Sequence, residues 1–165
     1  MKNFIINTST TKENIYQSII EQLPHLIEYD IGIDTNLCLI TSFLKMSFKN
    51  FSWCGFYFLK NNELIIGPFQ GKIPCTKIQV GKGVCGEVAK IKKPIIVKDV
   101  DKYTNHIRCD DDSKSEIVIP ILKNNFIIAV LDIDSNKLNT FDDIDSKYLE
   151  SICKFISKNI FDNEK

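Results

Sequence analysis

The spacing of apolar residues predicts helices near both ends of the chain. Ile15, Ile19 and Leu23 recur at helical intervals, and Pro24 is expected to kink or split the helix that contains them. Asn36 is expected to cap the helix that follows. The predicted helices cover residues 11–29, 35–47 and about 141–161.

Short apolar runs in the middle of the chain predict strands and one short helix. Asn61 and Asn62 separate two of these runs and are typical of a hairpin turn. A second hairpin is expected across residues 123–125, and a glycine- and proline-containing loop over residues 67–74. The predicted strands are 54–59, 64–66, 78–80, 94–99, 116–122 and 126–132, and the short helix is 84–91.

This order of elements predicts an α+β (mixed α/β) domain. Helices come first and last, with hairpins and one crossover helix between them. We therefore expect a mainly antiparallel central sheet with the terminal helices packed on one face. A length of 165 residues suits a single domain, residues 1–165.

Composition narrows the class of protein. Hydrophobic residues make up 44% and charged residues 25%, which is ordinary for a globular protein. Lys+Arg and Asp+Glu both count 21, so the balance gives no reason to expect nucleic acid or an anionic membrane as a partner. No apolar run approaches the ~18–20 residues of a spanning helix. These features predict a cytoplasmic protein.

The chain has six cysteines, which is more than a core needs and fewer than a disulfide scaffold uses. Cys38, Cys54 and Cys153 have apolar neighbours in predicted helices or strands. Free cysteine is among the most buried residue types, so we expect these three in the core.

The other three cysteines, Cys75, Cys85 and Cys109, are in or next to predicted loops with polar or glycine neighbours. Cys85 is near the start of a short helix, where the helix dipole favours a thiolate. Cys109 belongs to residues 100–114, a polar stretch that we interpret as an active-site loop or lid. These environments favour reactive thiols over accidental surface ones.

The neighbours of Cys109 have opposing effects on its expected reactivity. His106 and Arg108 are positioned in sequence to lower the pKa of its thiol, whereas Asp110 opposes them.

Two other motifs suggest different chemistry. The glycines of residues 81–86 match G-x-G-x-x-G, but too little parallel αβ sequence surrounds them for a dinucleotide site, so we interpret them as a tight turn. Cys75, Cys85, Cys109 and His106 could form a Cys₃His zinc site. Their spacing lacks the short ligand pairs of structural zinc sites, which favours redox chemistry.

Six short blocks, taken together and in order, resemble one family over about residues 10–156. The sequence resembles the free methionine-(R)-sulfoxide reductases, which are stand-alone GAF domains. The blocks are Trp53-Cys54-Gly55-Phe56-Tyr57, Gly67-Pro68-Phe69-Gln70-Gly71-Lys72, Gly83-Val84-Cys85-Gly86, His106-Ile107 followed by Cys109-Asp110, Ser115-Glu116-Ile117-Val118, and Leu131-Asp132-Ile133-Asp134-Ser135.

The resemblance assigns redox roles to the same three loop cysteines. It implies that Cys109 is the nucleophile and that Cys75 resolves it in a Cys75–Cys109 disulfide, with Cys85, and thus Cys85–Cys109, as the alternative. The cycle would pass through a sulfenic acid and a disulfide. Thioredoxin, supplied by NADPH through thioredoxin reductase, would reopen the disulfide. No bound cofactor or metal is expected, and a homodimer is implied.

The resemblance also implies a substrate pocket. Thiol attack on a sulfoxide needs an acid at the oxygen, a role open to Glu116 or Asp134. Asp132 and Asp134 alternate on a predicted strand, so both project from one face and suit the ammonium of a free amino acid. Trp53 offers an apolar wall to the S-methyl group, and Tyr57 completes the implied pocket.

Three positions depart from the family pattern. Ile73-Pro74 stands where Pro-Ala usually precedes the cysteine, and Thr104-Asn105 stands where Pro-Gly is usual. Arg108 replaces a small residue before the nucleophile.

The main alternative function is a non-catalytic GAF sensor that binds a small molecule, because fold alone does not decide activity.

Overall fold

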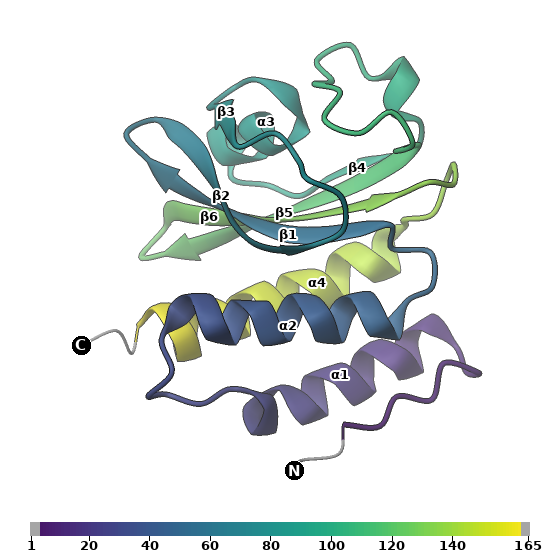
Figure 1. The fold of residues 1–165 in the computed structure, drawn as a ribbon, viewed down its shortest axis with the longest axis vertical. Helices are drawn as coiled ribbons and strands as arrows, with labels where there is room; N and C mark the ends of the chain where they lie inside the picture. The colour runs from purple at the N-terminus through teal and green to yellow at the C-terminus, as the bar shows by residue number, and fades with distance from the viewer. Residues whose placement is uncertain (1–3, 163–165) are drawn as a thin grey trace.

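A computed structural model describes residues 4–162 of the chain. In this described part, six strands form one antiparallel sheet in the order β3-β2-β1-β6-β5-β4 (Figure 1). The strands are β1 (Trp53–Lys60), β2 (Glu63–Gln70), β3 (Lys77–Gln79), β4 (Ile95–Val97), β5 (Ser115–Lys123) and β6 (Phe126–Ser135). The helices are α1 (Lys12–Leu26), α2 (Ile33–Ser47), α3 (Gly83–Ile91) and α4 (Asp143–Ile156), with a 3₁₀ turn at Val100–Lys102 and a π turn at Ser157–Phe161.

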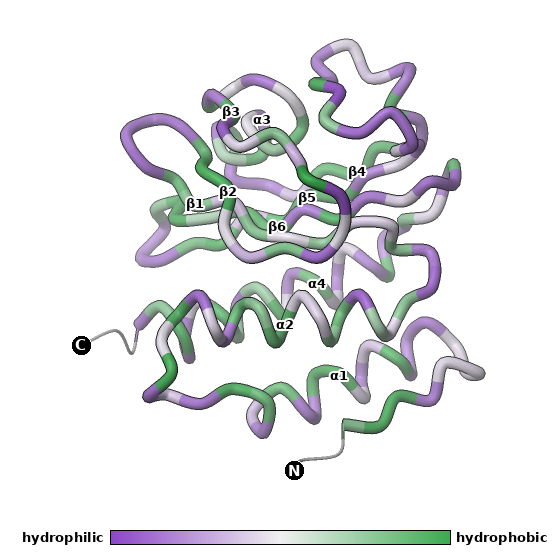
Figure 2. Tube along the Cα trace, in the orientation of Figure 1, coloured by the Kyte–Doolittle hydropathy of each residue, from purple (hydrophilic) through white to green (hydrophobic). Residues whose placement is uncertain are grey.

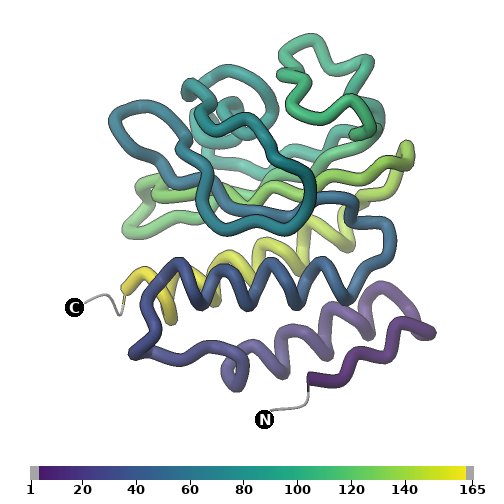
Figure 3. The backbone as a smooth tube through the Cα atoms, viewed as in Figure 1, coloured from purple at the N-terminus to yellow at the C-terminus, as the bar shows by residue number. Residues whose placement is uncertain are grey.

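Helices lie on both faces of the sheet. Helices α2 and α4 pack directly on one face, and α1 packs outside them (Figures 1 and 3). The predicted α+β class, with terminal helices on one face of an antiparallel sheet, is thus confirmed. The crossover helix α3 and the polar loops occupy the opposite face.

The alternation of side chains along the strands separates two apolar clusters. On β6, Leu131 and Ile133 face α1, α2 and α4, whereas Val130 faces α3. Figure 2 shows hydrophobic positions along the middle of the central strands and mainly polar positions along the loop over residues 100–114. Within residues 4–162, no helix is both long and apolar enough to span a bilayer.

The helix boundaries differ from the prediction at three points. Thr11 caps α1 by accepting a hydrogen bond from the Asn14 amide, and the helix ends at Leu26, two residues after Pro24, which lies inside its last turn. Helix α2 begins at Ile33 after Gly32, so the prediction of Asn36 as its cap was wrong. Asn36 is buried within the helix, and its amide donates to the Glu28 carbonyl at 2.7 Å.

The hairpin turns agree with the prediction. Asn61 and Asn62 have positive φ angles of 49° and 66°, which match the right-handed twist of a two-residue hairpin. Strand β2 is longer than predicted and takes in residues 67–70 of the expected loop. The strand can pass Gly67 and Pro68 because its register with β1 shifts between Gly55 and Tyr57.

Candidate functional site

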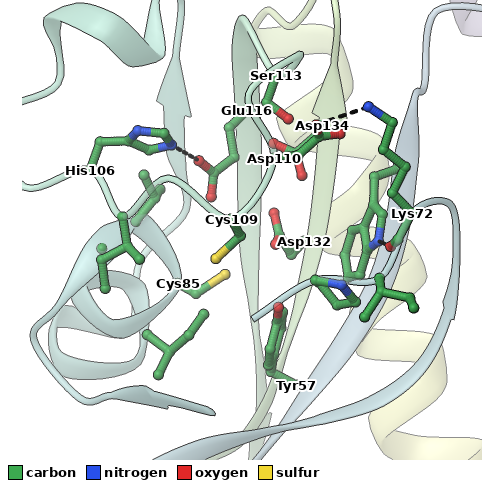
Figure 4. A pocket seen from close by; sticks show the side chains of 17 residues that line it. Tyr57, Lys72, Cys85, His106, Cys109, Asp110, Ser113, Glu116, Asp132 and Asp134 are labelled. Atoms are coloured by element: carbon green, nitrogen blue, oxygen red, sulfur yellow. Dashed lines mark hydrogen bonds and ion pairs between the residues drawn. The ribbon is translucent and has the colours of Figure 1, made fainter. Parts of the chain in front are cut away.

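A pocket lies between the sheet and α3, beneath two loops, residues 71–76 and 103–114 (Figure 4). It is partly open to solvent and is lined by side chains from the sheet, from α3 and from both loops. The predicted residues brought together in its lining are Trp53, Tyr57, Cys85, Cys109, Glu116, Asp132 and Asp134.

Three carboxyl groups form one wall of the pocket. Glu116 on β5 pairs directly with Asp134 on β6, and Asp132 lies two residues earlier on the same face. Glu116 and Asp132 are each only 6% exposed. Burial, and then the neighbouring carboxylates Asp132 and Asp134, raise the pKa of Glu116 well above its usual range. Burial also raises the pKa of Asp134 and brings that of Asp132 to about 7.

One oxygen of Asp132 has an unmet hydrogen-bonding need. Its Oδ1 is buried and has no hydrogen-bond partner among the described residues. A buried carboxylate oxygen without a donor is costly, so an oxygen of this kind favours a ligand that brings a proton donor or a positive charge. Figure 4 shows the Asp132 carboxyl facing the interior of the pocket.

The two loops are joined above this wall. A disulfide links Cys75 to Cys109, with 5.3 Å between their Cα atoms. Lys72 adds ion pairs with Asp110, at 3.1 Å, and with Asp112. Both cysteines are half-buried. The loops therefore close over the carboxyl groups while the disulfide stays near the surface.

Cys85 differs from the expectation. It is the third residue of α3, as predicted, but only 3% of it is exposed. Burial, followed by the nearby charges of Asp132 and Glu116, raises the pKa of its thiol. The expectation that the helix dipole favours a thiolate here was wrong, because burial beside carboxyl groups outweighs the dipole.

Two of the three cysteines predicted to lie in the core are buried, and one is exposed. Cys54 and Cys153 are buried against α1, α2 and α4, as predicted. Cys38 is exposed, so its prediction as a core residue was wrong. Leu37 and Ile40 are buried on the inner face of α2, and Cys38 lies on the opposite face.

Trp53 and Tyr57 hold the first loop in place. The Trp53 indole N–H donates to the Lys72 carbonyl at 3.0 Å, and the Tyr57 hydroxyl donates to the Cys75 carbonyl at 3.0 Å. Gly71 has φ +139°, and a Cβ there would lie 2.4 Å from Trp53 Cδ1. Both aromatic side chains are thus buried supports of the loop as well as pocket walls.

The second loop is held to α3 through Asn105. Its amide donates to the Gly81 carbonyl at 3.2 Å and to Glu87 Oε2 at 3.1 Å, and the Tyr103 hydroxyl donates to the same Glu87 oxygen at 2.7 Å. The Thr104-Asn105 pair departs from the family pattern, and there side-chain hydrogen bonds hold the loop in place.

The side chains of His106 and Arg108 lie beside different carboxyl groups. His106 Nε2 lies 3.9 Å from Glu116 Oε2, and burial together with Arg108 lowers the pKa of His106. Arg108 pairs with Asp101 and Asp111 and does not line the pocket.

Sequence reasoning missed Ser113, which is buried in the pocket lining and partly offsets the rise that burial causes in the pKa of Asp134. The polar stretch 100–114 was the only signal of its presence, and that stretch does line the pocket as predicted.

The alternative motifs are resolved by the fold. Gly81 and Gly83 have positive φ angles, and a Cβ on Gly86 would lie 2.3 Å from the Gln79 carbonyl oxygen, so the glycines form a tight turn as predicted. Strand β4 after α3 pairs antiparallel with β5, which is not a dinucleotide-binding βαβ unit. The disulfide removes Cys75 and Cys109 from the suggested Cys₃His set in this state.

Comparison with known proteins adds independent information. Residues 39–160 match the GAF domain family. GAF domain-containing protein A of Dictyostelium discoideum is 47% identical over 147 residues, covering 88% of this chain and 92% of that protein. The free methionine-R-sulfoxide reductase of Saccharomyces cerevisiae is 39% identical over 160 residues, covering 92% and 89%. The Neisseria meningitidis enzyme of the same name, solved with its substrate, superposes with a TM-score of 0.91 at 34% identity, covering 96% of this chain and 95% of that one.

Proposed function

The chain belongs to the family of free methionine-R-sulfoxide reductases built on a GAF domain, and on that premise we propose that it reduces free L-methionine (R)-S-oxide to methionine. The observation that carries this proposal is the Cys75–Cys109 disulfide at the mouth of a pocket walled by buried carboxyl groups. That arrangement places a redox-active thiol opposite acids in one small space.

Cys109 acts as the nucleophile. Its thiolate attacks the sulfoxide sulfur while an acid protonates the oxygen, methionine leaves, and Cys109 becomes a sulfenic acid. The Cys75 thiol then displaces water from that sulfenic acid and forms the disulfide. In sum, one sulfoxide and two thiols give methionine, one disulfide and one water.

Glu116 supplies the proton. Its carboxyl is buried, and burial raises its pKa, which favours the protonated form that a general acid at this position requires. The unpartnered oxygen of Asp132, with Asp134 beside it, receives the ammonium group of the free amino acid. Trp53 lies against the S-methyl group.

The reductant is a small dithiol protein of the thioredoxin class, itself reduced by NADPH through thioredoxin reductase. The half-buried position of Cys75 and Cys109 supports this, because a protein thiol can reach a disulfide only near the surface. A cytoplasmic location and a homodimer remain predictions that belong to the same proposal.

The test is a thioredoxin-coupled assay of NADPH oxidation with free R sulfoxide, free S sulfoxide and a peptide-bound sulfoxide. We expect turnover of the free R form and its loss in Cys109→Ser. Cys75→Ser should release about one product per enzyme and then stop, because no disulfide can form. Cys38→Ser, which alters an exposed thiol on α2, is the matched control.

The outcomes separate the alternatives. Substantial turnover by Cys109→Ser would overturn the assignment of the nucleophile. Normal recycling by Cys75→Ser would make Cys85 the resolving residue. Binding of methionine sulfoxide without turnover in the wild type would favour a sensor. Glu116→Gln should lower kcat by about 10²–10⁴-fold, and if Asp134→Asn does so instead, Asp134 is the acid.

A further inference from the structure

The pocket contains a group of potential metal ligands, one of which, Cys85, has no step in the proposed cycle. The Cys85 sulfur, one Glu116 oxygen and one Asp132 oxygen all lie within 4.8 Å of one another. All three residues are buried, and Cys85 is outside the disulfide. Figure 4 shows the Cys85 sulfur pointing from α3 toward the carboxyl groups of β5 and β6.

We propose that Cys85, Glu116 and Asp132 bind a thiophilic divalent cation of the zinc class, in competition with the amino-acid substrate. The independent observation is Asp132 Oδ1, a buried oxygen that has no partner among the described residues and belongs to a carboxyl facing the pocket. A cation would give this oxygen the positive charge that its buried position favours.

The ligand set selects the kind of cation. Zinc accepts thiolate and carboxylate ligands at about 2.3 and 2.0–2.2 Å, which places neighbouring ligand atoms roughly 3.4–3.6 Å apart. Because the three atoms lie within 4.8 Å of one another, they need to move inward by at most about 1 Å. Magnesium and calcium prefer oxygen ligands, so the thiol disfavours them.

The surroundings also favour a positive charge. Asp110 and Asp134 line the pocket together with the two ligand carboxyls. Lys72 directs its ammonium to Asp110 and Asp112 at the rim. The imidazole of His106 lies beside Glu116, where it can support that ligand as an outer partner.

Competition with substrate is the part of this inference that rests on the proposed function. The cation and the substrate ammonium would both use Asp132, so one excludes the other. With three protein ligands, a zinc ion would keep an open coordination position. Zinc would therefore inhibit the reductase reversibly, and a chelator would restore activity.

The test is a cobalt titration of the chelator-treated protein in its disulfide form, in which Cys75 and Cys109 cannot act as ligands. We expect one cobalt ion per chain, with the near-ultraviolet charge-transfer band of a cobalt–thiolate bond, and displacement by zinc. Cys85→Ser should abolish the band, and Cys38→Ser should retain it. Absence of the band, or its survival in Cys85→Ser, would overturn the proposal.

Two variants that keep the thiol guard against a folding defect in Cys85→Ser. Asp132→Asn and Glu116→Gln should each weaken cobalt binding by more than about tenfold, because even outer partners of a metal contribute that much. Unchanged affinity in both would overturn the ligand assignment.

Addition of L-methionine distinguishes this proposal from the proposed function. Methionine should displace cobalt, and cobalt that remains bound at saturating methionine would overturn the competition. If the protein binds cobalt through Cys85 but reduces no sulfoxide, the proposed function fails and the cation site stands.

Discussion

In the proposed function, Asp132 is the side chain on which substrate choice depends most directly. It shares a face of β6 with Asp134, which pairs with Glu116 on β5, and its Oδ1 lacks a partner among the described residues. A free amino acid brings an ammonium group to this oxygen, whereas a peptide-bound methionine brings only an amide. Under the proposed function, selectivity for the free amino acid would therefore follow from this one oxygen.

Asp132→Asn should raise KM for free methionine sulfoxide by about 10–100-fold, because a hydrogen bond to a charged group contributes about 1.5–3 kcal/mol. Steady-state kinetics with the thioredoxin-coupled assay measure this. Asparagine has nearly the same size as aspartate, so packing should be preserved.

N-acetyl-methionine sulfoxide is the matched control substrate because it lacks the ammonium group. The wild type should use it poorly, and Asp132→Asn should change its kinetics little. Equal losses on both substrates would contradict an ammonium contact at Asp132.

The cysteines illustrate which residue roles sequence can predict. Cys54 and Cys153 are buried where apolar neighbours suggested, but Cys38 is exposed although its neighbours are also apolar. A helix turns its next residue by about 100°, so neighbours in sequence do not share an environment. The raised pKa of Cys85 depends on burial and then on carboxyls from β5 and β6, which local sequence cannot place.

The two loops over the pocket are positioned by elements distant in sequence. Strand β1 holds the first loop through Trp53 and Tyr57, and α3 holds the second through hydrogen bonds with Tyr103 and Asn105. The disulfide and Lys72 then join the loops to each other. Placement of the cysteines thus depends on a support beneath each loop.

Gly71→Ala should lower turnover more than about tenfold, because small displacements of reacting groups cost rate steeply. Its Cβ would meet the Trp53 ring at 2.4 Å, at a φ of +139° that disfavours alanine. The coupled assay measures the change.

Gly32→Ala provides the control for backbone strain alone. Gly32 has φ +81°, yet nothing lies within 4 Å of an added Cβ. This variant should lose about 1–2 kcal/mol of stability and keep its kcat/KM. Normal turnover in Gly71→Ala would mean that contact with Trp53 does not position the loop.

Elements with strong local signals were predicted well. The asparagine pairs specify both hairpins through residues that tolerate positive φ. The start of α2 was misplaced because Gly32 caps it without a side-chain hydrogen bond, whereas Asn36 offered a better local signal. The extension of β2 through Pro68 depends on a register shift in β1, a tertiary effect that local pattern does not report.

At the scale of the whole molecule, the two faces of the sheet carry different kinds of residue. The face under α1, α2 and α4 buries the larger apolar cluster, and the face under α3 gathers the titratable groups. Burial raises the pKa of Asp132 from its ordinary 3.8 to about 7, and it raises those of Glu116 and Asp134 as well. These shifts make the stability of the empty protein depend on pH.

The free energy of unfolding should fall as pH rises from about 4 to about 7, the interval between the ordinary and the raised pKa of Asp132. In that window the folded chain retains carboxyl protons that the unfolded chain has already released, so rising pH favours unfolding by up to about 1.4 kcal/mol per pH unit for each such group. His106, whose pKa is lowered, acts in the opposite direction. Urea unfolding of the disulfide form at several pH values measures the slope.

Asp132→Asn should make this slope shallower, because asparagine does not titrate. Saturating L-methionine should do the same, since its ammonium stabilises the ionised carboxylates. A wild-type protein whose stability rises over the window, or a variant with the wild-type slope, would contradict the buried-carboxyl account.

The disulfide between Cys75 and Cys109 also alters the topology of the chain, because it closes a loop across a sequence separation of 34 residues that contains β3, α3 and β4. Closing such a loop stabilises a fold by about 4 kcal/mol in the chain-entropy description. In each catalytic cycle the chain would then change between a cross-linked form and a form without the cross-link. Limited proteolysis should cut the reduced protein faster than the oxidised one. Enzyme that has just consumed substrate would be the longer-lived species when reductant is scarce, so the lifetime of the protein would follow its own recent use.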